Sequence, residues 1–323
     1  MRAIVQDGYG QADALEVRDV PVPTPGASDV LVRVHAAGVN AADWHLMTGE
    51  PYVSRLAIGL RRPRNPIVGS DFSGVVEATG ADVTRFRIGD EVMGEADRGC
   101  LADYVCISDK YVVGKPSPLT HQQAAALPMG ALTALQALRD AGELQSGQSV
   151  LVNGASSGVG IYAVQIAIAM GATVTGVCSG RNIDMVKSLG TNVVVDYTQE
   201  DFVDTAERYD LVVDIVASRS LADIRRVLRP KGRYVIVGAA SMGKWFGLGR
   251  QVRTIATSPF VSQTLRPMLA RRTQEDLEHV RQMAEAGQLV PVIDRDYPFE
   301  DSAAAIRHVQ DGHARGKVVV TVA

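Results

Sequence analysis

Apolar residues recur with two different patterns along this chain, and the pattern changes near residue 120. Before that point, short apolar runs are separated by Gly, Pro and Asp, which predicts strands rather than helices. The predicted strands are residues 3–6, 15–20, 30–36, 74–78, 90–94 and 102–107. Their spacing is typical of an antiparallel, partly closed barrel. One short helix is predicted at 41–48, and the segment 48–66, rich in proline, glycine and arginine, predicts a long surface loop near a site.

After residue 120 the pattern first predicts two helices, at 120–127 and 131–141, with Pro128 and Gly130 breaking between them. Strands and helices then alternate. The predicted strands are 150–153, 173–177, 193–196, 211–215 and 233–237, and the predicted helices are 159–170, 183–189, 200–208 and 221–228. This alternation indicates a doubly wound parallel sheet, an α/β fold. A sixth strand is expected at 251–257, after the segment 238–249.

The last part of the chain returns to strands. An amphipathic helix is predicted at 273–287, strands at 289–297 and 317–322, and a helix at 301–311 between them. A six-stranded sheet is already complete, so we expect these strands to rejoin the first region. The first domain is then discontinuous, residues 1–120 and 289–323, and the inserted domain is 121–288.

The stretch from 149 to 178 has the pattern of a dinucleotide-binding βαβ unit: an apolar run, a Gly/Ser turn, an apolar helix and a second β-branched run. Of the three glycine positions in G-x-G-x-x-G only Gly160 matches, because the others hold Ala155 and Ser157, so the context carries the prediction. Backbone N–H groups that open a helix attract phosphate. The alternative is a tight turn that binds nothing. The residues expected to hold a cofactor pyrophosphate are Ser157, Gly158, Val159 and Gly160.

The end of the second strand of this unit predicts which dinucleotide binds. An NAD site usually has an Asp or Glu about 20 residues beyond the glycines, but here no acid occurs before Asp184. Ser179 and Arg181 can instead bind a 2′-phosphate through charge-assisted hydrogen bonds. We therefore expect NADP(H). Lys187 would add positive charge, unless it is a solvated lysine on an exposed helix face.

Composition excludes several classes of protein. The 323 residues are 46% hydrophobic and 21% charged, as in a globular protein with room for two cores. There is no apolar stretch of membrane-spanning length and no signal peptide, so we expect no membrane and a cytoplasmic location. The net charge of -3, with arginines in short scattered groups, gives no reason to expect nucleic acid. Three cysteines indicate a reducing compartment.

Five stretches, taken in order, resemble the medium-chain dehydrogenase/reductase superfamily: residues 38–43, 69–76, 86–94, 124–134 and 154–160. They are similar to its zinc-independent branch, the quinone oxidoreductases of the zeta-crystallin type and related enoyl reductases. The resemblance implies a GroES-like, partly closed β-barrel as the catalytic domain and a Rossmann domain for the cofactor. It also makes a homodimer our expectation, since oligomers are usual in this superfamily.

The residue types predict that no metal is bound. Zinc-dependent relatives have a Cys where this chain has Asn40 and a His-Glu pair where it has Ser70 and Asp71. Their structural zinc lobe needs four closely spaced cysteines, and this chain has Cys100 and Cys106 there. The six histidines form no ligand pair and are interpreted as surface or barrel residues.

The resemblance also assigns residues to the substrate side of the site. Asn40 would lie at the substrate end of the cleft, and Tyr52 matches a tyrosine often found near the quinone pocket, which makes it the candidate proton donor. The alternative is that Tyr52 is a tyrosine packed in a loop that is longer here than in the family pattern. Asp43 would orient neighbouring groups or cap the helix that begins beside it.

On the cofactor side the resemblance places Thr133 near the nicotinamide and Tyr197 on the adenine ribose side. Gly238, at the end of the fifth strand, would approach the nicotinamide, because strand carboxyl ends face the ligand in open α/β sheets. Lys317 either reaches the cleft or only begins a strand.

Without a Lewis acid, the easier reaction is hydride delivery from NADPH to a quinone or to the β-carbon of an activated C=C bond. The charge that develops on the substrate oxygen then needs a donor or a proton. Two alternatives stay open, a zinc-free NADP(H)-dependent alcohol or ketone reductase and a non-catalytic NADPH-binding protein. A short-chain dehydrogenase is disfavoured, because the only Tyr-x-x-x-Lys spacing, Tyr111 to Lys115, precedes the glycine turn.

Overall fold

The computed structural model describes residues 1–50, 52–237, 248–312 and 314–323. The chain divides into two compact units. Unit 1 is Met1–Leu132 with Arg272–Ala323, and unit 2 is Thr133–Arg271. The sequence pattern put these boundaries at 120 and 289. The difference comes from helices α3 (His121–Ala125) and α9 (Gln274–Glu285), since both pack against strands of unit 1.

Unit 1 is built on a long central strand, β3 (Asp29–Val39). One side of β3 pairs with β4 (Asp71–Thr79); the other side pairs first with β6 (Tyr104–Ser108) and then with β15 (Lys317–Thr321). The sheet continues through β5 (Glu91–Glu95), β7 (Val112–Gly114) and β14 (Ile293–Pro298), and the separate pair is β1 (Arg2–Val5) and β2 (Glu16–Asp19). The prediction that the C-terminal strands rejoin the first region is therefore confirmed.

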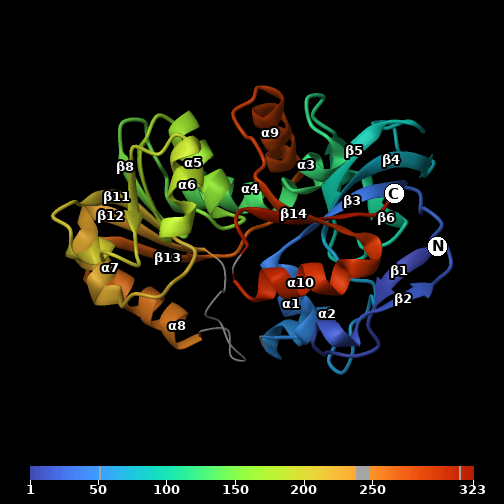
Figure 1. Cartoon of the computed structure of the whole chain (residues 1–323), viewed down its shortest axis with the longest axis horizontal. Helices are drawn as coiled ribbons and strands as arrows, with labels where there is room; N and C mark the ends of the chain where they lie inside the picture. The colour runs from blue at the N-terminus through green and yellow to red at the C-terminus, as the bar shows by residue number, and fades with distance from the viewer. Residues whose placement is uncertain (51, 238–247, 313) are drawn as a thin grey trace. The chain divides into compact units, whose positions relative to one another are not determined.

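The core of unit 1 follows from the alternation along β3, whose Val30, Val32 and Val34 are fully buried and belong to one cluster with Phe72. Helix α1 (Ala41–Thr48) forms as predicted and packs beside α10 (Ser302–Gln310), as Figure 1 shows. The segment expected to be a loop also contains the turn Tyr52–Ser54 and the short helix α2 (Arg55–Ile58).

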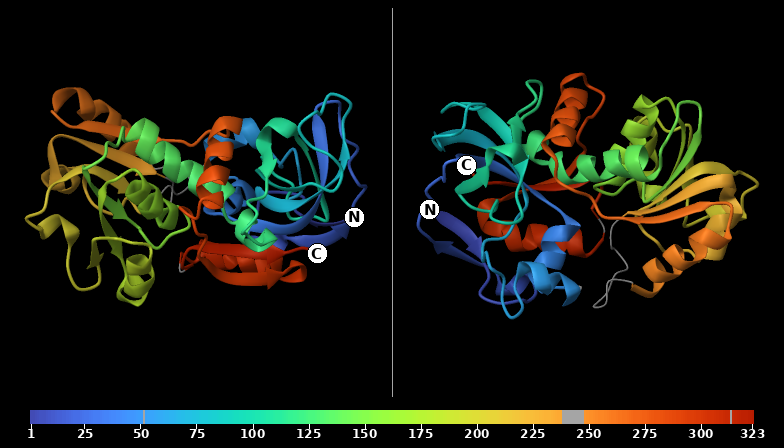
Figure 2. Two further views of the ribbon diagram at one scale, coloured as in Figure 1. Left: turned by 90° about the horizontal axis from the view of Figure 1, so that it is seen from above. Right: turned by 180° about the vertical axis from the view of Figure 1, so that it is seen from behind.

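Unit 2 is a six-stranded parallel sheet in the order β10-β9-β8-β11-β12-β13. Figures 1 and 2 show helices α5 and α6 on one face and α7 and α8 on the other. The strands are β8 (Ser149–Asn153), β9 (Thr173–Cys178), β10 (Val193–Asp196), β11 (Tyr209–Asp214), β12 (Leu228–Val237) and β13 (Thr264–Met268). The helices are α4 (Pro128–Gln136), shared with unit 1, α5 (Gly160–Ala169), α6 (Ile183–Ser188), α7 (Leu221–Val227) and α8 (Leu248–Thr257).

Three local predictions were wrong. Residues 251–257 form part of α8, and the sixth strand is β13; β-branched Val252 and Ile255 resemble a strand in composition, but their spacing of three places them on one helix face. Residues 200–208 contain only the 3₁₀ turn Phe202–Asp204, because the only apolar side chains that this segment buries in the core, Phe202 and Val203, are adjacent and do not recur at a helical spacing. Pro128 begins α4 instead of breaking it, as proline does at a first helical position.

Candidate functional site

The turn between β8 and α5 is too tight for side chains at its end. A Cβ on Gly160 would lie 2.0 Å from the backbone oxygen of Gly154, and Gly154 itself has a φ of 92°. The Ser157 hydroxyl accepts a hydrogen bond from the Gly160 N–H at 3.0 Å. Gly158 and Val159, which lie between Ser157 and Gly160, are half-exposed. The backbone at the start of α5 is therefore accessible, as a pyrophosphate site requires.

Asp214, which ends β11 and is completely buried, connects three neighbouring strands of the parallel sheet. Its carboxylate accepts hydrogen bonds from the Asn153 side chain at 2.8 Å, from the Ala217 N–H at 2.7 Å and from the Tyr234 hydroxyl at 2.8 Å. These groups come from the ends of β8 and β11 and from β12. Sequence reasoning missed Asp214, although an acid closing a buried apolar strand is an available signal.

A side-chain amide connects the glycine turn to the end of β9. Asn182 is buried, and its Nδ2 donates to the Ser156 hydroxyl at 3.0 Å and to the Ser179 hydroxyl at 3.2 Å. Arg181 is exposed beside it, and Lys187 is exposed on α6. The structure thus brings together the turn, Ser179 and Arg181, the three parts expected to hold the phosphates.

A carboxylate from the next strand, Asp196, also lies beside the end of β9. Asp196 ends β10, and its Oδ2 would be 2.6 Å from a Cβ on Gly180. Hydrogen bonds from the backbone N–H and the hydroxyl of Thr198 lower the pKa of Asp196 and hold its charge. An acid is therefore near Ser179 in space although none follows it closely in sequence.

The remaining predicted cofactor residues are placed as follows. Thr133 is half-buried in α4 and is the first residue of unit 2. Tyr197 is exposed, and its N–H donates to the Cys178 carbonyl at 3.1 Å, beside the end of β9. Gly238 lies outside the described residues.

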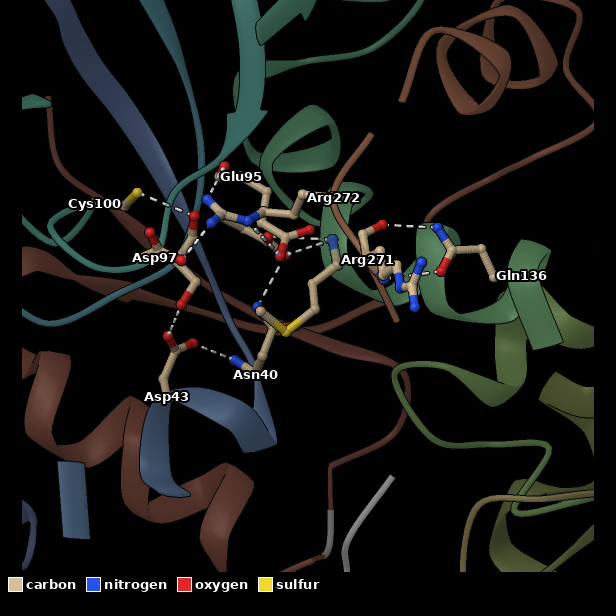
Figure 3. A network of polar contacts seen from close by, with 11 residues as sticks. Asn40, Asp43, Glu95, Asp97, Cys100, Gln136, Arg271 and Arg272 are labelled. Carbon is tan, nitrogen blue, oxygen red and sulfur yellow. Dashed lines mark hydrogen bonds and ion pairs between the residues drawn. The ribbon is translucent and has the colours of Figure 1, made fainter. Parts of the chain in front are cut away.

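Unit 1 contains a second, buried polar group centred on Asn40 (Figure 3). Asn40 follows β3, Asp71 begins β4 and Lys317 begins β15, and these are adjacent strands of the sheet. The Asn40 Nδ2 donates to Asp71 Oδ2 at 2.9 Å, and the Lys317 ammonium donates to Asn40 Oδ1 and lies 3.6 Å from Asp71 Oδ2. Lys317, expected on the cofactor side, is thus placed beside the predicted substrate residue.

Asp43 joins this group from α1. Its carboxylate accepts from the Asn40 N–H at 2.8 Å and from the Ser70 hydroxyl at 2.7 Å, while burial raises its pKa. The thiol of Cys100 donates to the Ser70 carbonyl at 3.1 Å. Asp43 therefore both closes the first turn of its helix and connects Asn40 to Ser70.

Glu95 is a buried carboxyl that sequence reasoning missed. It pairs across the ladder with Asp71, and burial together with the nearby Asp71 raises the pKa of Glu95 to about 8. The Arg272 guanidinium, 3.9 Å away and stacked over the Tyr111 ring, lowers this pKa only in part. Burial also raises the pKa of Asp71 to about 6, against the lowering effect of Lys317. At pH 7 the Glu95 carboxyl is therefore protonated, whereas the Asp71 carboxyl is ionised.

This arrangement predicts a pH-dependent stability. A carboxyl whose pKa is higher in the folded state binds more protons there, so the free energy of unfolding falls as pH rises from about 4.5 to 8, by up to about 1.4 kcal/mol per pH unit. Glu95→Gln is expected to flatten that decline and to be the more stable form at pH 8. Urea unfolding of both proteins at pH 5 and pH 8 checks this, and an equal pH slope in the two would contradict it.

The segment after α1 holds the candidate proton donor. Tyr52 is partly exposed, and the Arg55 guanidinium lies 4.7 Å from the centre of its ring. The sequence did not single out His45, on α1. Both of its ring nitrogens are buried without a hydrogen-bond partner among the described residues, and the centres of its ring and the Trp44 ring are 4.2 Å apart. Burial lowers the pKa of His45, which keeps its imidazole neutral at pH 7.

The residues around Asn40 do not fit a zinc ion. Zinc takes thiolate, imidazole and carboxylate ligands, whereas Asn40, Ser70 and Asp71 offer an amide, a hydroxyl and one carboxylate, and the Lys317 ammonium already lies against the Asn40 and Asp71 oxygens. Over the described ranges, no three or more His, Cys, Asp or Glu side chains are grouped so that they could hold a metal ion. No helix in the same ranges has the length and apolar character needed to cross a bilayer.

Comparison with known proteins agrees with this architecture. Residues 26–117 match the family model described as an alcohol dehydrogenase GroES-like domain, and residues 189–320 match one described as a zinc-binding dehydrogenase. The chain is 32% identical to the chloroplast envelope quinone oxidoreductase homolog of Arabidopsis thaliana, covering 99% of this chain and 98% of that protein. It belongs to the medium-chain dehydrogenase/reductase family, in the quinone oxidoreductase-like branch.

Two further relatives support the assignment. The mitochondrial NAD(P)H oxidoreductase RTN4IP1 of Mus musculus is 32% identical over 100% of this chain and 89% of its own length. The quinone oxidoreductase structure from Coxiella burnetii superimposes with a TM-score of 0.88 at 31% identity, covering 100% of this chain and 99% of that one. The predicted fold class, a GroES-like domain with a Rossmann-like parallel sheet, is confirmed.

Proposed function

We propose that this protein is an NADP(H)-dependent oxidoreductase that delivers hydride to a quinone or to an activated C=C bond without zinc. The observation that carries the proposal is the turn before α5, where a Cβ at Gly160 would fill the space next to the backbone oxygen of Gly154. Such a turn leaves N–H groups open to a pyrophosphate. The names of the quinone and NAD(P)H oxidoreductases to which the chain is similar support the same class of reaction.

The preference for NADP(H) rests on the end of β9. Ser179 is held by Asn182, and the exposed Arg181 supplies a guanidinium for a 2′-phosphate. The Asp196 carboxylate is close: Thr198 donates two hydrogen bonds to its Oδ1, while its Oδ2 lies beside Gly180, so the proposal requires the Arg181 guanidinium to outweigh this charge at the 2′-phosphate. Lys187 and Tyr197 complete the set proposed for the adenosine end, and Thr133 and Gly238 that for the nicotinamide end.

Arg181→Ala is expected to raise the KM for NADPH about 10- to 100-fold and to leave the KM for NADH within about twofold, since one charge-assisted contact of 1.5–3 kcal/mol is lost only with the phosphorylated cofactor. Steady-state kinetics with both cofactors measures this. The matched control is Arg226→Ala, which removes an exposed arginine paired with Asp223 on α7 of the same unit. Equal effects of Arg181→Ala on both cofactors would remove the argument.

We propose that residues of unit 1 bind and orient the acceptor. When bound, the nicotinamide cofactor supplies a hydride. The oxygen of the acceptor then gains charge, which the second amide hydrogen of Asn40 can stabilise, because within the described ranges Asn40 Nδ2 donates only to Asp71. Tyr52 is the proposed proton donor, and Asp43 orients Asn40 through its backbone N–H.

Oxidation of NADPH with a panel of quinones and enones tests the proposal, with Tyr52→Phe as the variant for the proton step. Turnover on quinones or enones supports it, whereas turnover on simple ketones or alcohols would favour the alternative reductase. Tight NADPH binding with no turnover on any acceptor would instead identify a non-catalytic NADPH-binding protein.

The homodimer and the cytoplasmic location also stay predictions. Strand β13 is at one end of the parallel sheet, and the exposed side chains near it include Phe260 at 88% and Leu269 at 80%. An unpaired sheet edge with exposed apolar neighbours favours association. Sedimentation equilibrium at micromolar protein concentration should give twice the chain mass of 34.5 kDa, and a single-chain mass would contradict this.

A further inference from the structure

We propose that Lys317 is a positioning residue that holds the side-chain amide of Asn40 in one orientation. This deepens the proposed function and rests on it, since Asn40 is there the group that meets the acceptor oxygen. The ammonium of Lys317 donates to Asn40 Oδ1, and Asn40 Nδ2 donates to Asp71 Oδ2 at 2.9 Å.

Charge determines which way the amide faces. An ammonium can only donate a hydrogen bond and an ionised carboxylate can only accept one. If the Asn40 amide were rotated by half a turn, its NH₂ would face the Lys317 ammonium and its oxygen would face the Asp71 carboxylate. Both contacts would then be repulsive, so the pair selects one of the two amide orientations.

The backbone fixes the two charges on either side of Asn40. Lys317 follows Gly316, whose φ is 87°. A Cβ added to Gly316 would lie 2.4 Å from the Val292 backbone oxygen. The Lys317 N–H donates to the same Val292 oxygen at 2.8 Å. Asp71 pairs with Gly38 across the ladder and accepts from the Met129 N–H at 3.2 Å. These bonds fix the backbone from which each charged side chain extends, and the Met129 N–H also holds the Asp71 carboxylate itself.

Burial makes the arrangement sensitive to the loss of either charge. The side chains of Lys317 and Asp71 are 2% and 0% exposed, so water cannot replace the missing partner. The carboxyls near Asp71 are Asp43 and Glu95, and Lys317 is the cation that most lowers its pKa, which burial raises to about 6. Without the ammonium, the pKa of Asp71 would rise further and its hold on Asn40 Nδ2 would weaken.

The activity test compares Lys317→Met with wild type in the NADPH-bound enzyme. We expect kcat for the acceptor to fall on the order of 10- to 100-fold, with the Kd for NADPH unchanged. Asn40→Ala should cause a similar loss, and the double variant no further loss, because Lys317 acts through Asn40. The matched control is Lys110→Met, which removes an exposed lysine that packs on the Tyr111 ring.

A readout independent of turnover separates this inference from the proposed function. In labelled protein, the Asn40 side-chain NH₂ signals are assigned by their loss in Asn40→Ala, and the carboxyl of Asp71 is titrated by carbon NMR. Lys317→Met should shift the Asn40 signals and raise the Asp71 pKa, even if wild type reduces no acceptor in the panel. Should this variant not fold, Lys317→Gln carries the same expectations. Unmoved Asn40 signals, or a kcat equal to wild type in a folded variant, would overturn the proposal.

Discussion

Replacing Asp214 with alanine is expected to lower the free energy of unfolding of unit 2 by at least about 3 kcal/mol, because each buried donor left without an acceptor costs about 1–3 kcal/mol. Three donors depend on this carboxylate: the Asn153 side chain, the Ala217 N–H and the Tyr234 hydroxyl. Asn153 and Ala217 lie at the edge of the sheet that carries the glycine turn, so cofactor binding should weaken as well. Urea unfolding measures the first effect, and hydrogen exchange on β8, β11 and β12 locates it.

Asp214→Asn is the matched control for this experiment. Its remaining Oδ1 can still accept from Asn153 and Ala217, and the Tyr234 hydroxyl can rotate to accept from the new NH₂ group. The cost should therefore be well below that of alanine. Equal destabilisation by the two substitutions would show that charge, and not the number of acceptors, is what this position supplies.

Gly160→Ala is expected to reduce NADPH affinity on the order of 10- to 100-fold, because displacing even one N–H from a phosphate loses about 1.5–3 kcal/mol. The added methyl would lie 2.0 Å from the Gly154 oxygen and 2.8 Å from the Ala155 backbone carbonyl carbon, so the turn itself must move. Both contacts are with backbone atoms, which cannot move aside as the end of a flexible side chain can. Titration of NADPH by fluorescence or calorimetry measures the loss.

The control for this substitution is Gly114→Ala, at the end of β7, where an added Cβ would meet nothing within 4 Å. It should leave NADPH affinity and stability close to those of wild type. A Gly160→Ala protein that bound NADPH as tightly as wild type would mean that the turn does not cradle the pyrophosphate, and the proposed cofactor site would have to be abandoned.

Most elements of the fold could be predicted because local periodicity decides them. Alternating apolar residues in β3 and the continuous apolar run of β8 are what an antiparallel strand with one solvated face and a buried parallel strand require. The prediction was wrong at α8, where the β-branched Val252 and Ile255 suit a strand in composition, and it missed β7, whose three residues are too few to show any period. Pairing with β5 decided β7, whereas at α8 the three-residue spacing of Val252 and Ile255, both more than half exposed, fits a helix.

For the candidate site, the chain order predicted the parts that are continuous in sequence. One turn contains Ser157, Gly158, Val159 and Gly160, and the end of one strand carries Ser179 and Arg181. Their positions in the sequence therefore predicted which of them lie close together. The carboxylate of Asp196 could not be placed beside Gly180 in this way, because that contact depends on the parallel pairing of β9 with β10. The same holds for Asp214 and its partners.

By itself, the sequence determined the succession of strands and helices, the open turn at Gly160, and the lack of an acid directly after β9, since each depends on residues close together in the chain. Only the tertiary structure decided that Lys317 binds Asn40, a partner 277 positions away, and that Glu95 lies across from Asp71. Strand pairing brings distant residues into one buried space, and burial there gives their charges effects that exposed groups do not have.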